Sequence, residues 1–156
     1  MKIVIAGAGE VGSHLAKMLS GEANEITVID ERQERLDALS TTCDAITVEG
    51  NPSAIKVLHD AGVENADLFI AVNPSESQDV NIVSAMLAKK MGSKKATARI
   101  NNEEYLSYEN KYMFTEMGID LMFYPEKIAA GEIRDLLKRT ASSDSLEFAR
   151  GKLHMA

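Results

Sequence analysis

Three glycines close to the amino terminus have a spacing that suits phosphate binding. They belong to the run Gly7-Ala8-Gly9-Glu10-Val11-Gly12. In this spacing the first glycine permits a sharp turn, the second lets a pyrophosphate approach the backbone, and the third lets a following helix pack closely. The N–H groups at the start of that helix, together with the helix dipole, then face the phosphates. The run therefore predicts a site for the phosphates of a nucleotide.

An acidic residue stands where a nucleotide ribose is expected. Asp30 follows Gly12 by about 20 residues, the spacing of a carboxylate that accepts hydrogen bonds from the ribose hydroxyls. Such a carboxylate favours NAD over NADP, because a 2′-phosphate would meet a like charge. Arg32 leaves this preference open, since it either reaches a phosphate or stays solvated at the start of a helix.

Polar and small residues follow the other predicted strands, and ligands of parallel sheets bind at these carboxyl ends. The further candidate binding residues are Glu31, Arg32, Gly50, Asn51, Ala71, Val72, Asn73 and Arg99. Asn51 suits an adenine edge or a plain helix-start turn equally well. Asn73 is a candidate contact for the far ribose or phosphate. Arg99 ends a predicted buried strand and needs a partner, either a nucleotide phosphate or an internal carboxylate such as Glu76 or Asp79.

Residues for catalysis are not evident. The three histidines fall in predicted helices or in the tail, and no Ser-Tyr-x-x-x-Lys pattern or metal-ligand spacing occurs. We therefore expect no catalytic residue, no metal site and no enzymatic activity.

Strand-like and helix-like segments alternate along the chain. The predicted strands are 2–6, 25–30, 45–48, 67–72, 96–100 and 121–124. The predicted helices are 13–19, 31–39, 54–61, 78–91, 103–117 and 126–138. In helix 31–39 Arg35 is expected on the solvent face, and in helix 78–91 the apolar side consists of Ile82, Val83, Met86, Leu87 and Met91. Asn51 or Ser53 is expected to cap the third helix, Asn101 or Asn102 the fifth. The alternation predicts an α/β fold: a Rossmann-like, doubly wound, parallel six-stranded sheet of order 3-2-1-4-5-6 with helices on both faces.

Length and composition narrow the class of protein. Residues 1–139 form the expected nucleotide-binding domain, and residues 140–156 read as a linker and the start of a further domain that is cut. The net charge of −7 and the pI of about 5.0 argue against a nucleic-acid partner. The single cysteine, Cys43, allows no intrachain disulfide and fits a reducing compartment. No signal peptide or apolar run long enough to insert into a membrane is recognised, so we expect a cytoplasmic location.

The motifs together resemble the TrkA N-terminal domain, also called the RCK or KTN domain, of regulators of bacterial potassium uptake systems. The resemblance runs from Lys2 to about Leu137. The segments that show it are Lys2–Gly12, Ile26–Asp30, Val48–Pro52, Ala66–Val72 and Ala98–Ile100. The tail segment 146–152 is similar to the linker into the family's small C-terminal domain.

The resemblance implies a ligand, a set of partners and a role. It implies NAD(H) binding, with ATP or ADP in some members, and places Gly7, Gly9 and Gly12 on the phosphates, Asp30 on the ribose and Arg99 near the nucleotide. It also implies a homo-oligomer, a dimer or a higher ring, held at the inner face of the membrane by an integral potassium transporter that it gates. Asn73 departs from the family, because many members carry Thr there, and this puts contacts at that position in doubt.

Two functional hypotheses from different classes are consistent with these motifs. The leading hypothesis is a nucleotide-sensing regulatory domain, and the alternative is a fragment of an NAD-dependent oxidoreductase that lacks its catalytic domain. A scaffold that keeps the fold without a ligand is a third possibility. The negative charge of Glu10 disfavours an exposed triphosphate and points to NAD(H). The predicted helix 126–138 is the expected dimer contact.

Overall fold

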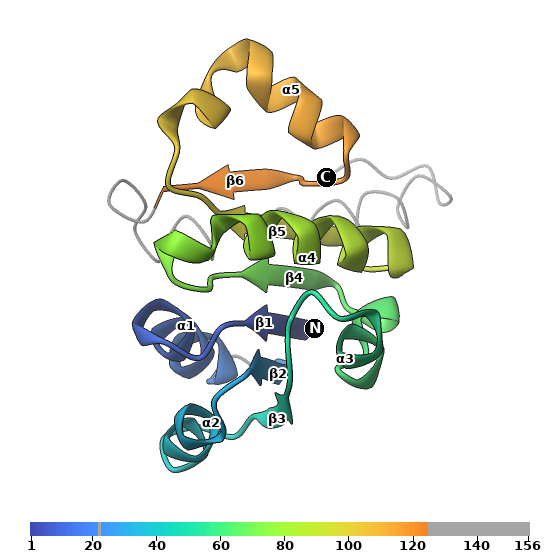
Figure 1. The fold of residues 1–156 in the computed structure, drawn as a ribbon. Helices are drawn as coiled ribbons and strands as arrows, with labels where there is room; N and C mark the ends of the chain where they lie inside the picture. Colours follow the sequence, from blue (N-terminus) through green and yellow to red (C-terminus); the bar gives the residue numbers. More distant parts are fainter. Residues whose placement is uncertain (22, 125–156) are drawn as a thin grey trace.

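The computed structural model of the chain describes residues 1–21 and 23–124. It contains one six-stranded sheet with the order β3-β2-β1-β4-β5-β6, in which all neighbouring strands are parallel (Figure 1). The strands are β1 (Lys2–Ala6), β2 (Glu25–Asp30), β3 (Ile46–Glu49), β4 (Leu68–Ala71), β5 (Lys95–Arg99) and β6 (Leu121–Phe123). The predicted doubly wound topology is confirmed.

Helices cover both faces of this sheet (Figure 1). The α-helices are α1 (Glu10–Ser20), α2 (Gln33–Ser40), α3 (Ile55–Asp60), α4 (Gln78–Met91) and α5 (Tyr108–Glu116). The short 3-10 helices are η1 (Val63–Asn65), η2 (Ser75–Ser77) and η3 (Glu103–Leu106). Helices α1 and α2 pack on one face, while α3, α4 and the segment around α5 pack on the other. None of the helices within the described residues has both the length and the apolar character needed to cross a bilayer.

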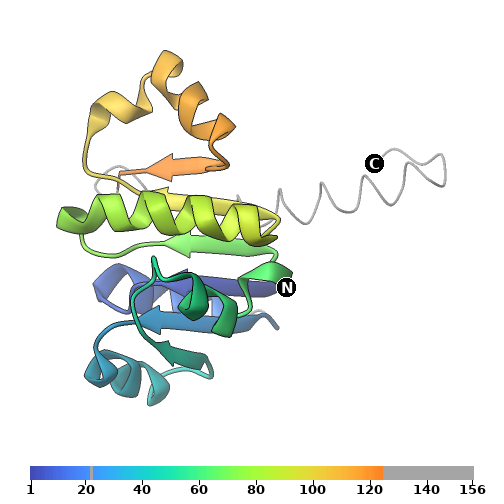
Figure 2. The same ribbon diagram turned by 45° about the vertical axis from the view of Figure 1, so that its right-hand side comes forward.

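The two central strands are apolar at almost every position because both of their faces are covered. Residues 3–6 of β1 and 68–71 of β4 are completely buried. All strands run in the same direction, so their carboxyl ends and the loops that follow lie along one edge (Figure 2). The sheet is therefore a rigid platform that brings the candidate site residues to that edge.

The first two helices do not begin where the sequence predicts. Helix α1 begins at Glu10 rather than at residue 13, because the chain leaves its extended conformation directly after Gly9. Its first turn therefore contains the last part of the glycine run. Helix α2 begins at Gln33 rather than at residue 31, because Arg32 remains extended. Its N–H group donates a hydrogen bond to the carboxylate of Asp30.

The predicted helix 103–117 is wrong as one element. Ser107 has an extended conformation, with φ −61° and ψ 150°, and separates η3 from α5. Its hydroxyl accepts a hydrogen bond from the N–H of Asn110 and so caps α5, whereas Asn102 caps η3 as expected. The capping serine restarts the helix in a new direction, and helical periodicity cannot show such a break.

The predicted cap of the third helix is also wrong. The N-cap of α3 is Ala54, which has no side chain for capping. The side-chain oxygen of Asn51 instead accepts hydrogen bonds from the N–H and hydroxyl of Ser53. Asn51 thus closes its own turn before the helix begins.

Small residues, rather than the predicted bulky ones, form the buried face of α4. The buried positions of α4 are Asn81, Ser84, Ala85 and Ala88. They recur at helical spacing, and their small side chains let α4 lie close to β4 and β5. The apolar side chains on which the sequence analysis relied lie at the flanks, and Val83 is 44% exposed.

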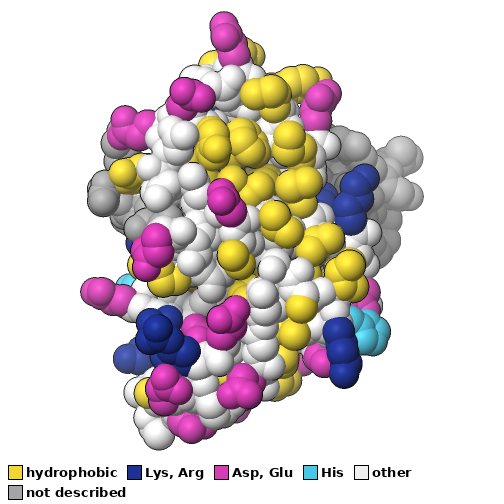
Figure 3. All heavy atoms as spheres, in the orientation of Figure 1, with side chains coloured by type: hydrophobic (Ala, Val, Ile, Leu, Met, Phe, Trp, Pro, Cys, Tyr) yellow, Lys and Arg dark blue, Asp and Glu magenta, His cyan; other side chains and the backbone are white. Residues whose placement is uncertain are grey.

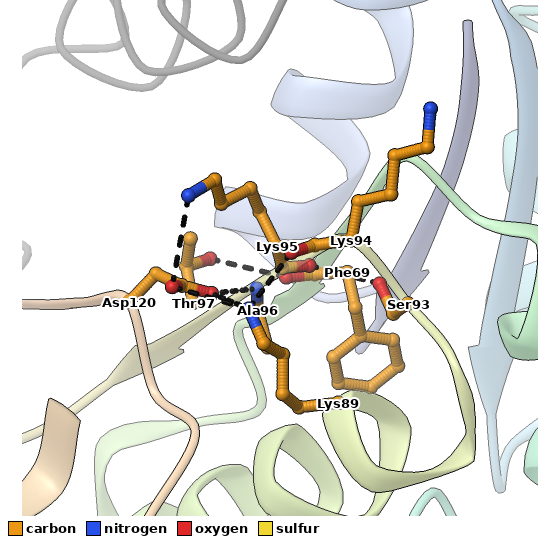
Figure 4. Close-up of polar contacts among 8 residues, drawn as sticks. All are labelled: Phe69, Lys89, Ser93, Lys94, Lys95, Ala96, Thr97 and Asp120. Atoms are coloured by element: carbon orange, nitrogen blue, oxygen red, sulfur yellow. Dashed lines mark hydrogen bonds and ion pairs between the residues drawn. The ribbon is translucent and has the colours of Figure 1, made fainter. Parts of the chain in front are cut away.

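Asp120 ties the outer strand β6 to its neighbours at the amino edge of the sheet (Figure 4). Its Oδ2 accepts hydrogen bonds from the N–H of Ala96, at 2.8 Å, and from Nζ of Lys89, at 2.9 Å. Lys95 Nζ lies 3.9 Å from Oδ1 of the same carboxylate. One carboxylate therefore joins the segment before β6, strand β5 and the end of α4.

Two predicted features lie outside the described residues. They are the helix 126–138 with its proposed dimer contact, and the division of the chain into residues 1–139 and 140–156.

The Asp120 contacts lead to a prediction for stability. The substitution Asp120→Ala should lower the free energy of unfolding by about 1–3 kcal/mol, because the N–H of Ala96 and two ammonium groups lose their acceptor. Urea denaturation followed by circular dichroism measures the change. Asp44→Ala removes an exposed carboxylate and should have little effect; an equal loss in both variants would contradict the prediction.

Candidate functional site

The glycine turn after β1 packs directly against the backbone at the end of β4. Gly7 has φ +115°, and a Cβ atom at this position would lie only 2.9 Å from the backbone nitrogen of Asn73. The N–H of Gly7 donates to the carbonyl oxygen of Ile29, at 2.8 Å. This position therefore needs glycine both for its backbone conformation and for the close contact.

The other two glycines of the turn have different surroundings. A Cβ atom at Gly12 would lie 1.7 Å from the carbonyl oxygen of Gly7, so the start of α1 cannot carry a side chain there. At Gly9 the nearest atom to such a Cβ is Nη1 of Arg35, at 3.8 Å. No side chain caps α1. Gly9 and the free N–H groups of the first helical turn thus face open space, and this geometry fits a pyrophosphate.

Asp30 is buried beside this turn at the end of β2, with 5% of its surface exposed. Its Oδ2 accepts a hydrogen bond from the N–H of Ala8, and its Oδ1 accepts one from the N–H of Arg32, both at 2.8 Å. Arg35 Nη1 lies 3.7 Å from Oδ2. Because a carboxylate has about four acceptor positions, Asp30 can still accept hydrogen bonds from ribose hydroxyls.

Two adjoining pockets lie along the carboxyl ends of the strands. The first, which we call the Arg99 pocket, has a volume of about 280 Å³ and is lined by Gly9, Glu10, Val11, Arg35, Val72, Pro74, Glu76 and Arg99. The second, the Asp30 pocket, has a volume of about 230 Å³ and is lined by Asp30, Glu31, Arg32, Arg35, Pro52, Asn73, Pro74, Glu76, Ser77 and Val80. Arg35, Pro74 and Glu76 line both, so the pockets are adjacent, and we call the two together the trough.

Arg99 brings an unpaired positive group to this trough. Its Nε is buried and has no hydrogen-bond partner in the part of the chain that the structure describes. Neither Glu76 nor Asp79, the carboxylates that the sequence analysis considered, forms an ion pair with it among residues 1–21 and 23–124. The side chain is therefore available to an anion in the Arg99 pocket, which is the other partner considered.

The structure brings most, but not all, of the predicted site residues to the trough. Those that line it are Gly9, Glu10, Val11, Asp30, Glu31, Arg32, Val72, Asn73 and Arg99. Those that do not line it are Gly7, Ala8, Gly12, Gly50, Asn51 and Ala71. The residues of the second group shape the ends of the strands and the turns, and Ala8 orients the carboxylate of Asp30.

Sequence reasoning missed two residues at this site. Arg35 was assigned to the solvent face of α2, yet its side chain is only 33% exposed and it lines both pockets. Asn81 is fully buried under the ends of β4 and β5 and bonds to both. A polar residue within the small-residue stripe of α4 was the signal that could have found it. Within the described residues, no group of three or more His, Cys, Asp or Glu is arranged to hold a metal ion.

Comparisons with known proteins identify sequence relatives. The model of the family described as TrkA-N domain matches residues 3–125. The Trk system potassium uptake protein TrkA homolog of Archaeoglobus fulgidus is 36% identical over 99% of this chain and 34% of its own length. The Trk system potassium uptake protein TrkA of Haemophilus influenzae is 36% identical over 98% of this chain and 33% of its own length. The chain thus spans about a third of the curated relatives that it matches.

Solved structures share the fold at lower identity. The TrkA-N domain of the inner membrane protein ybaL from Escherichia coli has a TM-score of 0.66 and 21% identity, covering 88% of this chain and 94% of that domain. The GsuK channel bound to NAD has a TM-score of 0.63 and 16% identity, covering 78% of this chain and 21% of the channel chain. At such identities the likeness concerns the fold alone.

The contact between the glycines leads to a prediction about the site. Gly12→Ala should abolish nucleotide binding and lower the free energy of unfolding by about 1–3 kcal/mol, because the new methyl group overlaps the carbonyl oxygen of Gly7. Calorimetric titration and thermal melting measure the two effects. Gly21→Ala is the matched control at the other end of α1, where a Cβ meets nothing within 4 Å. A binding-competent Gly12→Ala variant would disprove this assignment of the turn.

Proposed function

This chain belongs to the TrkA-N domain family, and we propose that it is a nucleotide-binding regulatory domain of a potassium-uptake system. The observation that carries the proposal is the trough, whose two adjacent pockets are lined by the start of α1, by a buried carboxylate and by an arginine whose Nε has no hydrogen-bond partner within the described residues. These are the groups that bind phosphates and a ribose. The domain binds its ligand as a signal and performs no chemistry on it.

NAD(H) is the ligand that this trough suits best. The turn at Gly9 accommodates a pyrophosphate, and Asp30 holds the adenosine ribose. The remaining part of the dinucleotide then extends into the Arg99 pocket. Glu10 and Glu76 line that pocket beside two arginines, so a compact triphosphate would meet negative as well as positive charge. ATP and ADP are the competing ligands to be tested.

Regulation requires that the ligand has different affinities for two conformations of the protein. The trough is formed by the ends of five strands and by the starts of α1 and α4, so a ligand in it contacts several elements at once. A dinucleotide that occupies both pockets stabilises the conformation of the protein in which both pockets are formed. In our proposal this preference is passed to the transporter.

The proposed partner is an integral membrane potassium transporter or channel. The support comes from the names of the relatives, which are Trk system potassium uptake proteins, and from the TrkA-N domain family to which the chain belongs. In this proposal the domain lies at the inner face of the membrane and is held there through its partner. The curated relatives are about three times as long as the matched region, which supports a proposal that this domain acts within a longer protein.

A second copy of the chain is a further proposed partner. Apolar side chains gather on the face formed by α4 and α5 (Figure 3). The exposed large apolar residues on these helices are Val83, Tyr108, Tyr112, Met113 and Met117. Tyr108 is 93% exposed and Tyr112 is 64% exposed. Exposed apolar patches of this kind mark surfaces that associate with protein, which supports a homo-oligomer.

The ligand assignment is tested by removing the ribose-binding carboxylate. Asp30→Ala should weaken NADH binding by about 1–3 kcal/mol, because buried hydrogen bonds to the ribose are lost. Isothermal calorimetry with NADH, NADPH, ATP and ADP measures the affinities and identifies the preferred ligand. Asp67→Ala is the matched control, since it removes a carboxylate with a similar backbone N–H bond at the opposite edge of the sheet. If the unaltered chain binds none of the four nucleotides, the proposed function is wrong.

Self-association of the chain is tested by a substitution on the exposed apolar face of α4 and α5. Tyr112→Glu should shift the chain from oligomer to monomer, because a charge is then buried against the apolar surface of a second copy. Sedimentation velocity over a range of concentrations measures the shift. Lys17→Glu, on the last turn of α1, alters the charge of an exposed site on the other face of the sheet and should leave association unchanged. A monomeric unaltered chain would refute the proposed contact.

A further inference from the structure

One buried polar side chain is shared between the ends of two strands that form the trough. Asn81 lies in the first half of α4 and is completely buried. It does not line either pocket, so it cannot be a ligand contact. The cost of burying an amide is offset only when all of its hydrogen bonds are formed.

All hydrogen-bonding positions of this amide are used. Its Oδ1 accepts from the backbone N–H and from the side-chain Nδ2 of Asn73, both at 2.9 Å. Its Nδ2 donates to the carbonyl oxygen of Asn73, at 3.1 Å, and to that of Arg99, at 3.0 Å. An amide offers two donor hydrogens and two acceptor positions, so Asn81 is fully satisfied. An acid, which lacks the donors, would place an oxygen against two carbonyl oxygens.

These bonds connect the ends of β4 and β5 to each other and to α4. The backbone of Asn73 is also the surface against which the glycine turn packs at Gly7. Arg99, at the end of β5, lines the Arg99 pocket, and its Nε has no hydrogen-bond partner among residues 1–21 and 23–124. A second bond from α4, in which Gln78 Oε1 accepts from the N–H of Asn101 at 3.0 Å, holds the same region.

The carboxylate of Asp30 is held by other groups. The carboxylate of Asp30 is oriented by the N–H groups of Ala8 and Arg32 and by the Arg35 side chain. None of these groups bonds to Asn81. The ribose-binding carboxylate is thus positioned separately from the ends of β4 and β5, although Asn73, which Asn81 does hold, lines the Asp30 pocket.

We propose that Asn81 is a positioning residue that sets the Arg99 half of the trough and so determines the affinity for a dinucleotide over a mononucleotide. The inference rests on the proposed function, in which the adenosine ribose binds at Asp30 and the distal half of NAD(H) extends toward Arg99. Because Asn81 belongs to α4, occupancy of the Arg99 pocket and the position of this helix are linked through it.

The test compares NADH with AMP, which carries only the adenosine half. Asn81→Asp, measured by calorimetry on the chain of 156 residues, should weaken NADH binding at least tenfold and AMP binding less than threefold. In an Arg99→Met background, the effect of Asn81→Asp on NADH should shrink to less than twofold, because the group that it positions is absent. Asn81→Ser, whose hydroxyl replaces the amide, should weaken NADH binding to an intermediate degree. It takes the place of Asn81→Asp in the test if that variant does not fold.

A matched control separates positioning from a general loss of stability. Thr97→Val removes a buried hydroxyl that bonds to the carbonyl of Phe69 in the middle of β5, away from the trough. It should leave the ratio of NADH to AMP affinity unchanged. Equal weakening of both ligands by Asn81→Asp, or an unchanged NADH affinity, would overturn the inference while the unaltered chain still binds NADH. Failure of the unaltered chain to bind either nucleotide would instead overturn the proposed function.

Discussion

The contact between the glycine turn and the end of β4 is the constraint on which the rest of the site depends. At Gly7 and at Gly12 the neighbouring backbone leaves no room for a Cβ atom. This close packing fixes where α1 begins, and hence where its free N–H groups point. It also brings β1, β2 and β4 together at one edge, since Gly7 is bonded to the end of β2 and touches the residue after β4.

Charges at that edge are arranged in pairs rather than as one positive surface. Asp30 is held by two backbone N–H groups and faces Arg35, which lines both pockets. Glu10 and Glu76 line the Arg99 pocket together with two arginines. Such an alternation suits a ligand that carries hydroxyls and a limited number of phosphates, and it supports our choice of a dinucleotide. In an acidic chain, the two arginines supply local positive charge without a basic face.

The opposite edge of the sheet has a structural role. Lysines and aspartates there form ion pairs, and the carboxylates of Asp67 and Asp120 also accept hydrogen bonds from backbone N–H groups. These contacts hold the start of β1, β4 and β5 and the segment before β6. The two edges thus differ: at the amino edge the carboxylates of Asp67 and Asp120 are paired with protein groups, whereas at the carboxyl edge Nε of Arg99 has no hydrogen-bond partner within the described residues.

The sequence by itself determined the order of the strands, the position of the glycine turn and the identity of the acid that follows β2. These features depend on local patterns: apolar runs, a fixed glycine spacing and an alternation of strands and helices that permits few topologies. Only the tertiary structure decided which side chains share the trough. Arg35 and Asn81 have the pattern of ordinary helical residues, but the packing of α2 and α4 on the sheet brings Arg35 to the trough and places Asn81 beneath it. The break at Ser107 and the turn at Asn51 were hidden for the same reason, since each depends on a side-chain hydrogen bond that periodicity does not record.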